Sequence, residues 1–291
     1  MPYIRIERWG ETYRLVELFN ASDERPPPQP TVHEDSPNEE ELHLMEEFTE
    51  LRPGAEDAKK AERFLSSIIR ARSKVREYAL CQHWEYFATF TLADEKQDRF
   101  DIRGFIKDLG NWIQNYNKKY HCKLQYLIIP ELHKNGAWHA HGLLRNVSPD
   151  SLIKNEYGYL DMPYYKKRFG FISLSKVKSH EKCASYVTKY ISKDVQATAA
   201  HLQPGQHLYY ASRGLAVKEV LWVASTPQHI QGGFKNEYGI FKWVKKEEAL
   251  DYIRNDARSR EEVLSHQREG QGHTDVDSIH ANEPDSGSRT G

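Results

Sequence analysis

The sequence predicts an α+β protein in which helices pack against a central antiparallel β-sheet. Segments with apolar residues at helical spacing alternate with short runs rich in aromatic and β-branched residues, which are typical of strands. Between residues 58 and 194 the predicted order is helix, strand, helix, strand, strand, strand, helix. The last three strands are joined without the helical crossover that parallel strands need, so we expect them to be antiparallel.

Composition divides the 291 residues into five segments. Residues that alternate between apolar and polar around Trp9-Gly10 predict a hairpin, whereas prolines and acids without periodicity predict an extended linker. The segments are a β-hairpin (1–19), an acidic proline-rich linker (20–57), a main domain led by a basic helix (58–215), a C-terminal extension with two strands and a short helix (216–258), and a disordered tail (259–291).

Each predicted element of the main domain has its own pattern. The helices show apolar residues three and four apart, and Asn135-Gly136 is a strong hairpin-turn signal between two strands. We expect helices at 58–81, 101–120 and 179–194, and strands at 86–92, 123–130, 137–144 and 170–177. Beyond this domain we expect strands at 217–225 and 237–246 and a short helix at 247–258.

Charge is distributed unevenly along the chain. The formal net charge of −1 conceals a segment, residues 58–258, with 33 Lys and Arg against 20 Asp and Glu, a net charge of +13. By contrast, residues 20–57 carry 12 acidic and 2 basic residues. A basic excess of this size suits a polyanion such as DNA or RNA, and the alternative is a solvated basic surface.

Other classes of protein are disfavoured. No apolar run approaches the roughly 20 residues of a membrane helix, and the N-terminus lacks the pattern of a signal peptide. The cysteines, Cys81, Cys122 and Cys183, are far apart and form no CxxC pair. We therefore expect free thiols, no membrane association and a reducing cytoplasm.

The stretch "PELHKNGAWHAHGLL" contains a candidate metal site. His139 and His141 are two residues apart on a predicted strand and therefore point to the same face. A hairpin turning at Asn135-Gly136 would bring Glu131 beside them. Two imidazoles and a carboxylate can hold Mg²⁺, Mn²⁺ or Zn²⁺ with positions left open for a substrate. The alternative is three polar residues on a solvated sheet face, and His133, in the turn, is a possible fourth ligand or a surface residue.

The stretch "YVTKYISK" contains candidate nucleophiles. On a helix Tyr186, Lys189, Tyr190 and Lys193 share one side, at the border between core and solvent. A tyrosine is a weak nucleophile at its ordinary pKa of about 10, but a nearby ammonium stabilises its phenolate. The alternative is an amphipathic helix with surface tyrosines.

Three stretches together resemble the motifs of HUH endonucleases, the superfamily that includes rolling-circle replication initiators of phages and plasmids. They are "FATFTL", "WHAHGLL" with Glu131, and "YVTKYISKD", whose paired tyrosines resemble the two-tyrosine phage branch. The stretch "YYASRGL" is also similar to phage replication proteins, so the resemblance covers about residues 84–215. One departure is Ala140, which is smaller than the hydrophobic residue often found between the two histidines; we expect it to pack inward.

The resemblance implies a ferredoxin-like, RRM-like sheet and a site-specific DNA endonuclease and strand transferase. A divalent metal, Mg²⁺ or Mn²⁺, held by Glu131, His139 and His141 would bind the scissile phosphate of single-stranded or hairpin origin DNA. Attack by Tyr186 or Tyr190 would leave a 5′-phosphotyrosine and a 3′-OH, with Lys189 and Lys193 stabilising the phenolate or leaving oxygen. Because no GxxxxGK[ST] motif is present, a host helicase and polymerase are implied, in a bacterial cell carrying a phage, plasmid or integrated element.

Alternatives remain open at this stage. A relaxase or transposase of the same superfamily would share the motifs. A noncatalytic nucleic-acid-binding module would share only the sheet, whereas in the endonuclease the target DNA would be held by the basic surface and stacked on aromatic residues such as Tyr164 and Tyr165. A zinc hydrolase would use the same three ligands with a bound water, and both tyrosines would then be dispensable.

Overall fold

The computed structural model describes residues 3–19, 55–156, 158–192, 207–225, 229–235 and 239–271. In chain order the elements are β1 (Tyr3–Trp9), β2 (Thr12–Leu18), α2 (Ala55–Cys81), β3 (Tyr86–Phe90), α3 (Ile102–Tyr120), β4 (Gln125–Leu132), β5 (Trp138–Arg145), η1 (Pro149–Ser151), β6 (Ile153–Lys154), β7 (Leu160–Asp161), α4 (Pro163–Arg168), β8 (Ile172–Lys176), α5 (His180–Ser192), β9 (Tyr210–Ala211), β10 (Glu219–Ser225), β11 (Phe234–Lys235), β12 (Gly239–Val244) and α7 (Lys246–Gln271).

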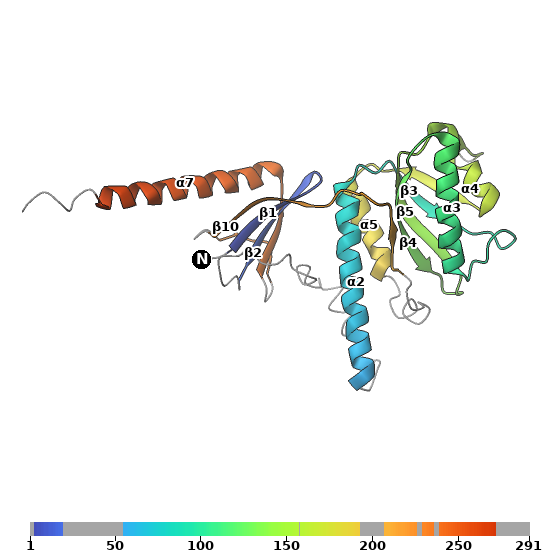
Figure 1. The fold of residues 1–291 in the computed structure, drawn as a ribbon, viewed down its shortest axis with the longest axis horizontal. Coiled ribbons are helices and arrows are strands. Elements are labelled where there is room, and N and C mark those ends of the chain that lie inside the picture. Colours follow the sequence, from blue (N-terminus) through green and yellow to red (C-terminus); the bar gives the residue numbers. More distant parts are fainter. Residues whose placement is uncertain are drawn as a thin grey trace, which may run out of the picture. The chain divides into compact units, whose positions relative to one another are not determined.

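The main domain is built on a seven-stranded sheet in the order β6-β7-β8-β3-β5-β4-β9. Its pairings are antiparallel, which confirms the predicted α+β class and the antiparallel sheet. Helices α3 and α4 cover one face of the sheet, and α2 and α5 cover the other (Figure 1). The sheet is therefore the middle layer of three.

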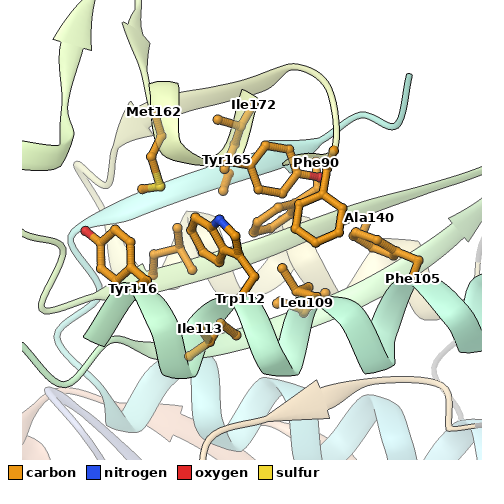
Figure 2. Packing of buried hydrophobic residues seen from close by; sticks show 14 of the residues in the cluster. Phe90, Phe105, Leu109, Trp112, Ile113, Tyr116, Ala140, Met162, Tyr165 and Ile172 are labelled. Carbon is orange, nitrogen blue, oxygen red and sulfur yellow. The ribbon is translucent and has the colours of Figure 1, made fainter. Parts of the chain in front are cut away.

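The α3 face holds a densely aromatic core (Figure 2). Phe105, Leu109 and Trp112 recur at helical spacing on α3 and are almost completely buried. Ala140 lies in this core, where its small side chain complements its large cross-strand partner Phe90. The prediction that Ala140 packs inward is confirmed, and strand alternation consequently turns its neighbours His139 and His141 toward the opposite face.

That opposite face is covered by α2 and α5. Ile68 and Val75 of α2, and Val187 and Ile191 of α5, pack on Leu127, Ile129 and Leu143 of the central strands. Burial of these aliphatic side chains fixes α5 along the sheet. The residues directly before Val187 and Ile191 in the sequence, Tyr186 and Tyr190, therefore lie at the edge of this layer.

A second, five-stranded sheet joins distant parts of the chain in the order β10-β1-β2-β12-β11. The N-terminal hairpin predicted for residues 1–19 is its centre, and strands from the segment after residue 216 pair with both of its edges. Cys81, Cys122 and Cys183 are free, as expected. Among the described residues, no helix carries the long apolar stretch that a bilayer-crossing segment requires.

Within the five-stranded sheet, Glu7 is completely buried and ion-paired with Arg5, Arg14 and Lys218. Burial alone would raise the pKa of Glu7, but Arg14, Lys218 and Arg5 together lower it to about 2. The indole of Trp9 also donates to Glu7, at 2.9 Å. This network makes a buried charge tolerable because each neighbour stabilises the ionised form.

The hairpin turn contacts the end of α2. Trp9 packs with Leu80 and Trp84, and Gly10 has a φ of +64°. A Cβ on Gly10 would lie 2.1 Å from the Leu80 carbonyl oxygen, so only glycine allows this approach. The position of the turn is thus fixed both by the close approach of Gly10 to the Leu80 carbonyl and by the burial of Trp9.

Outside the main domain, the C-terminal helix is longer than predicted, and most of the predicted acidic linker lies outside the described residues. The short helix predicted for 247–258 continues to Gln271, because residues 259–271 are rich in Arg, Glu and Gln, which favour helix even without an apolar face. From Glu247 onward this helix belongs to a separate unit of the chain. The acidic linker predicted for 20–57 lies outside the described residues, except at 55–57, where α2 begins.

Candidate active site

The β4–β5 hairpin brings the three predicted metal ligands onto one face. Glu131 pairs directly with His139 in the register, and His141 follows two residues later. The turn is closed by a hydrogen bond from His133 N to the Ala137 carbonyl oxygen, at 2.9 Å, and Gly136 has a φ of +81°. The predicted turn at Asn135-Gly136 is confirmed, and it sets the register that aligns the ligands.

Glu131 and His141 form a buried pair. Glu131 Oε2 lies 2.6 Å from His141 Nε2, and both side chains are almost completely enclosed. The other ring nitrogen, Nδ1, lies 3.2 Å from the Thr89 hydroxyl on the neighbouring strand β3. The two contacts together fix the orientation of the His141 ring.

His139 is half-buried beside this pair. Its ring stacks on His133, with centroids 4.0 Å apart and planes 28° apart. Burial lowers the pKa of His139, and the neighbouring His133 and His141 lower it further, while Glu131 opposes them. A neutral imidazole has the free lone pair that a metal ion requires. His133 itself is exposed, although it contacts His139.

Tyr186 and Tyr190 of α5 lie over the Glu131–His141 pair. The Tyr190 ring stacks on His141 with centroids 3.9 Å apart, and its hydroxyl donates to the Tyr186 hydroxyl at 2.7 Å. Tyr186 is half exposed and packs edge-on against Phe87, with centroids 5.3 Å apart. Burial, the contact with Tyr186 and the charge of Glu131 raise the pKa of Tyr190.

The other predicted site residues have different positions. Lys189 is exposed on α5, between the two tyrosines in the sequence, and Lys193 lies outside the described residues. Tyr165 is completely buried in the α3-side core, and Tyr164 packs against that core. The suggestion that Tyr165 stacks on bases is therefore wrong, because its ring is enclosed in the core, whereas Tyr164 is only partly buried; both lie on the α3 side of the sheet.

Two residues of the site were not predicted, Phe87 and Thr89. Both belong to the strand "FATFTL" and share the His141 face through strand alternation. The available signal was the alternation itself: Ala88 and Phe90 lie in the aromatic core, so the residues between and before them must face the other way. The partners of Phe87 and Thr89, however, are set by cross-strand pairing that the sequence of one strand does not reveal.

The donors of the site suit a divalent ion. Glu131, His139 and His141 offer one carboxylate and two imidazoles from adjacent strands, a set that accepts Mg²⁺, Mn²⁺ or Zn²⁺. In the described part of the chain no three His, Cys, Asp or Glu side chains already converge as ligands, and the Glu131 carboxylate is hydrogen-bonded to His141. If an ion bound here, Glu131 and His141 would each bind the ion in place of their hydrogen bond to each other.

One known family matches the segment that carries these residues. Residues 85–195 match the family model of replication-associated protein ORF2/G2P. The matched segment runs from the start of β3 to just beyond α5 and contains every residue of the site described above. It supports a replication initiator family and a role in replication. No curated protein and no solved structure matches the chain.

Proposed function

We propose that the chain is an HUH-type rolling-circle replication initiator of the two-tyrosine branch, which nicks and rejoins single-stranded origin DNA through a 5′-phosphotyrosine. The observation that carries the proposal is the convergence of two tyrosine hydroxyls, 2.7 Å apart, over a buried carboxylate–imidazole pair. A noncatalytic nucleic-acid-binding module would not require this arrangement. The family match to residues 85–195 supports it independently.

In the proposed reaction Tyr186 is the first nucleophile. Its oxygen bonds to the scissile phosphorus, the bond from phosphorus to O3′ breaks, and the phenol proton is in effect transferred to the departing 3′-oxygen. The hydrogen bond donated by Tyr190 stabilises the negative charge on the Tyr186 oxygen as it gives up its proton. Because one phosphodiester replaces another, the linkage keeps the energy needed for rejoining.

The surrounding residues support this step. Negative charge on the phosphate would be neutralised by Mg²⁺ or Mn²⁺ held by Glu131, His139 and His141. In a His141 ring that binds the ion through Nε2, Nδ1–H would donate to the Thr89 hydroxyl, which orients the ring as a supporting residue does for a metal ligand. Lys189, and Lys193 beyond it, would stabilise the leaving oxygen. A host helicase and polymerase, in the cytoplasm of a bacterial cell, would then open the duplex and extend the 3′-OH.

The deciding experiment seeks the covalent intermediate. The protein is incubated with Mn²⁺ and labelled single-stranded DNA from the origin of its own replicon, and adducts are separated on a denaturing gel. Wild type is compared with Tyr186→Phe, Tyr190→Phe and the double variant, with and without chelator. An adduct that is lost in the double variant and with chelator is the expected result.

Each alternative function predicts different products on this gel. Cleavage that survives the double variant indicates a zinc hydrolase acting through bound water. Binding without any adduct indicates a noncatalytic module. A relaxase or transposase would form the adduct on transfer-origin or transposon-end DNA in preference to a replication origin, so these substrates are included as competitors.

A further inference from the structure

A large open cavity lies on the α2 side of the main sheet, apart from the Tyr186–Tyr190 site. It has a volume of about 890 Å³ and lies between α2 and the segment 207–215, which includes the edge strand β9. Among the described residues that line it, none is acidic. In a chain with nearly equal numbers of acidic and basic residues overall, such a lining is a distinctive feature.

Basic residues enter the cavity from both walls. Arg70 and Lys74 come from α2, and Arg213 comes from the opposite segment. Lys74 is paired with Glu77 at 2.5 Å, so its charge is largely balanced. Arg70 and Arg213 are both exposed. A planar guanidinium on each wall can bind a phosphate through two hydrogen bonds.

Aromatic side chains also line the cavity. Tyr78 of α2 meets Tyr209 of the other wall edge-on, with centroids 6.4 Å apart. Tyr78, Tyr209 and Tyr210 are only partly buried. Partly exposed aromatic rings beside cations provide surfaces on which unpaired bases stack. Duplex DNA, whose bases are already stacked, would not use them.

The cavity borders β9, which pairs with β4, the strand that carries Glu131. Tyr210 pairs with Ile128 of β4, three residues before Glu131 on the same strand. At about 3.3 Å per residue the two positions are roughly 10 Å apart along β4. About three stacked nucleotides, at a rise of about 3.4 Å, span that length, and fewer nucleotides of an extended single strand do so. One strand of DNA can therefore reach both the cavity and the active site.

We propose that this cavity, formed by α2 and residues 207–215, binds the single-stranded DNA next to the cleaved phosphate. Arg70 and Arg213 contact its phosphates, and Tyr209 stacks on its bases. The proposal rests on the proposed function for its choice of DNA. It assigns a binding role to α2, which lies outside the segment that matches the family model.

The test measures the affinity of the full chain for a fluorescent single-stranded origin oligonucleotide across a series of salt concentrations. The variant Arg70→Gln/Arg213→Gln removes two exposed charges from the cavity. The matched control, Lys107→Gln/Lys118→Gln, removes two exposed charges from α3 on the other face of the sheet. Thermal unfolding of all three proteins checks that they fold alike, and Tyr209→Leu tests stacking separately.

The cavity variant should weaken binding at least tenfold and reduce the slope of log Kd against log salt by about 1.4, the value for two lost phosphate contacts to a single strand. The control should leave both unchanged. Equal weakening in the two variants, no weakening in the cavity variant, or equal affinity for duplex DNA would overturn the proposal. Cavity-dependent binding without a tyrosine adduct would reject the proposed nicking function while the binding site stands.

Discussion

Tyr190 lies flat against His141, with ring centroids 3.9 Å apart and planes 16° apart. The stack leaves the Tyr190 hydroxyl directed to Tyr186 and the edges of the imidazole free to contact Glu131 and Thr89. One helix and three strands thereby share a single contact network. The two tyrosines consequently have different environments, although the sequence presents them as a repeat of the same motif.

This difference predicts unequal effects of removing the two hydroxyls. Tyr186→Phe should abolish the covalent DNA adduct, because Tyr186 is the more exposed residue and accepts the hydrogen bond. Tyr190→Phe should slow adduct formation by about 10- to 100-fold, since a hydrogen bond to a charged group contributes about 1.5–3 kcal/mol. Single-turnover rates measure both. The reverse order of severity would exchange the assigned roles.

Thr89 is expected to control metal affinity without touching the metal. Thr89→Val keeps the shape of the side chain but removes the hydroxyl that contacts His141 Nδ1. Loss of such a supporting hydrogen bond typically weakens metal binding by about 10- to 100-fold. Calorimetric titration with Mn²⁺ gives the affinity, and Thr91→Val, two residues along the chain, is the control. An unchanged affinity would show that Thr89 has no orienting role.

Acid should destabilise the five-stranded sheet through Glu7. Its folded pKa is lowered to about 2 from an ordinary 4.5, so its stabilising contribution is complete above about pH 4.5 and is lost as the pH falls toward 2. Glu7→Gln should cost about 3–5 kcal/mol at neutral pH, because three cations lose their partner, and should flatten this pH dependence.

Urea unfolding followed by the fluorescence of Trp9 and Trp243, which pack 5.5 Å apart in the same sheet, measures the effect of Glu7→Gln. The exposed Glu181→Gln serves as the control substitution. Identical pH profiles for wild type and Glu7→Gln between about pH 5 and about pH 2 would contradict the assigned role.

Gly10 should be far less tolerant of substitution than a comparable surface glycine. Gly10→Ala combines a positive φ with a Cβ only 2.1 Å from the Leu80 carbonyl oxygen, whereas Gly214 has a φ of +75° and nothing within 4 Å. Gly214→Ala should cost about 1–2 kcal/mol from backbone strain alone. Gly10→Ala should cost clearly more, as judged by the free energy of unfolding. Equal costs would mean that the hairpin does not depend on this contact.

The sequence by itself determined the elements of the main domain and the central residues of the site. Periods of 3.6 and 2 residues report which side chains are buried, so they located α3, β4, β5 and α5, and Asn135-Gly136 set the turn that aligns Glu131 with His139. These signals are local. They act through backbone hydrogen bonds and burial within one element or one hairpin, where the sequence alone carries the information.

Only the tertiary structure decided which distant residues meet. Thr89 and His141 are 52 positions apart, and Lys218 reaches Glu7 from a remote part of the chain. The burial of Tyr165 follows from the packing of α3 and α4 on the sheet, which its local sequence does not reveal. The cavity forms because β9 pairs with β4 beside α2. Such contacts depend on how whole layers pack and on strand pairing between remote segments. No short pattern encodes them, because the free energy that selects them is shared over the entire core.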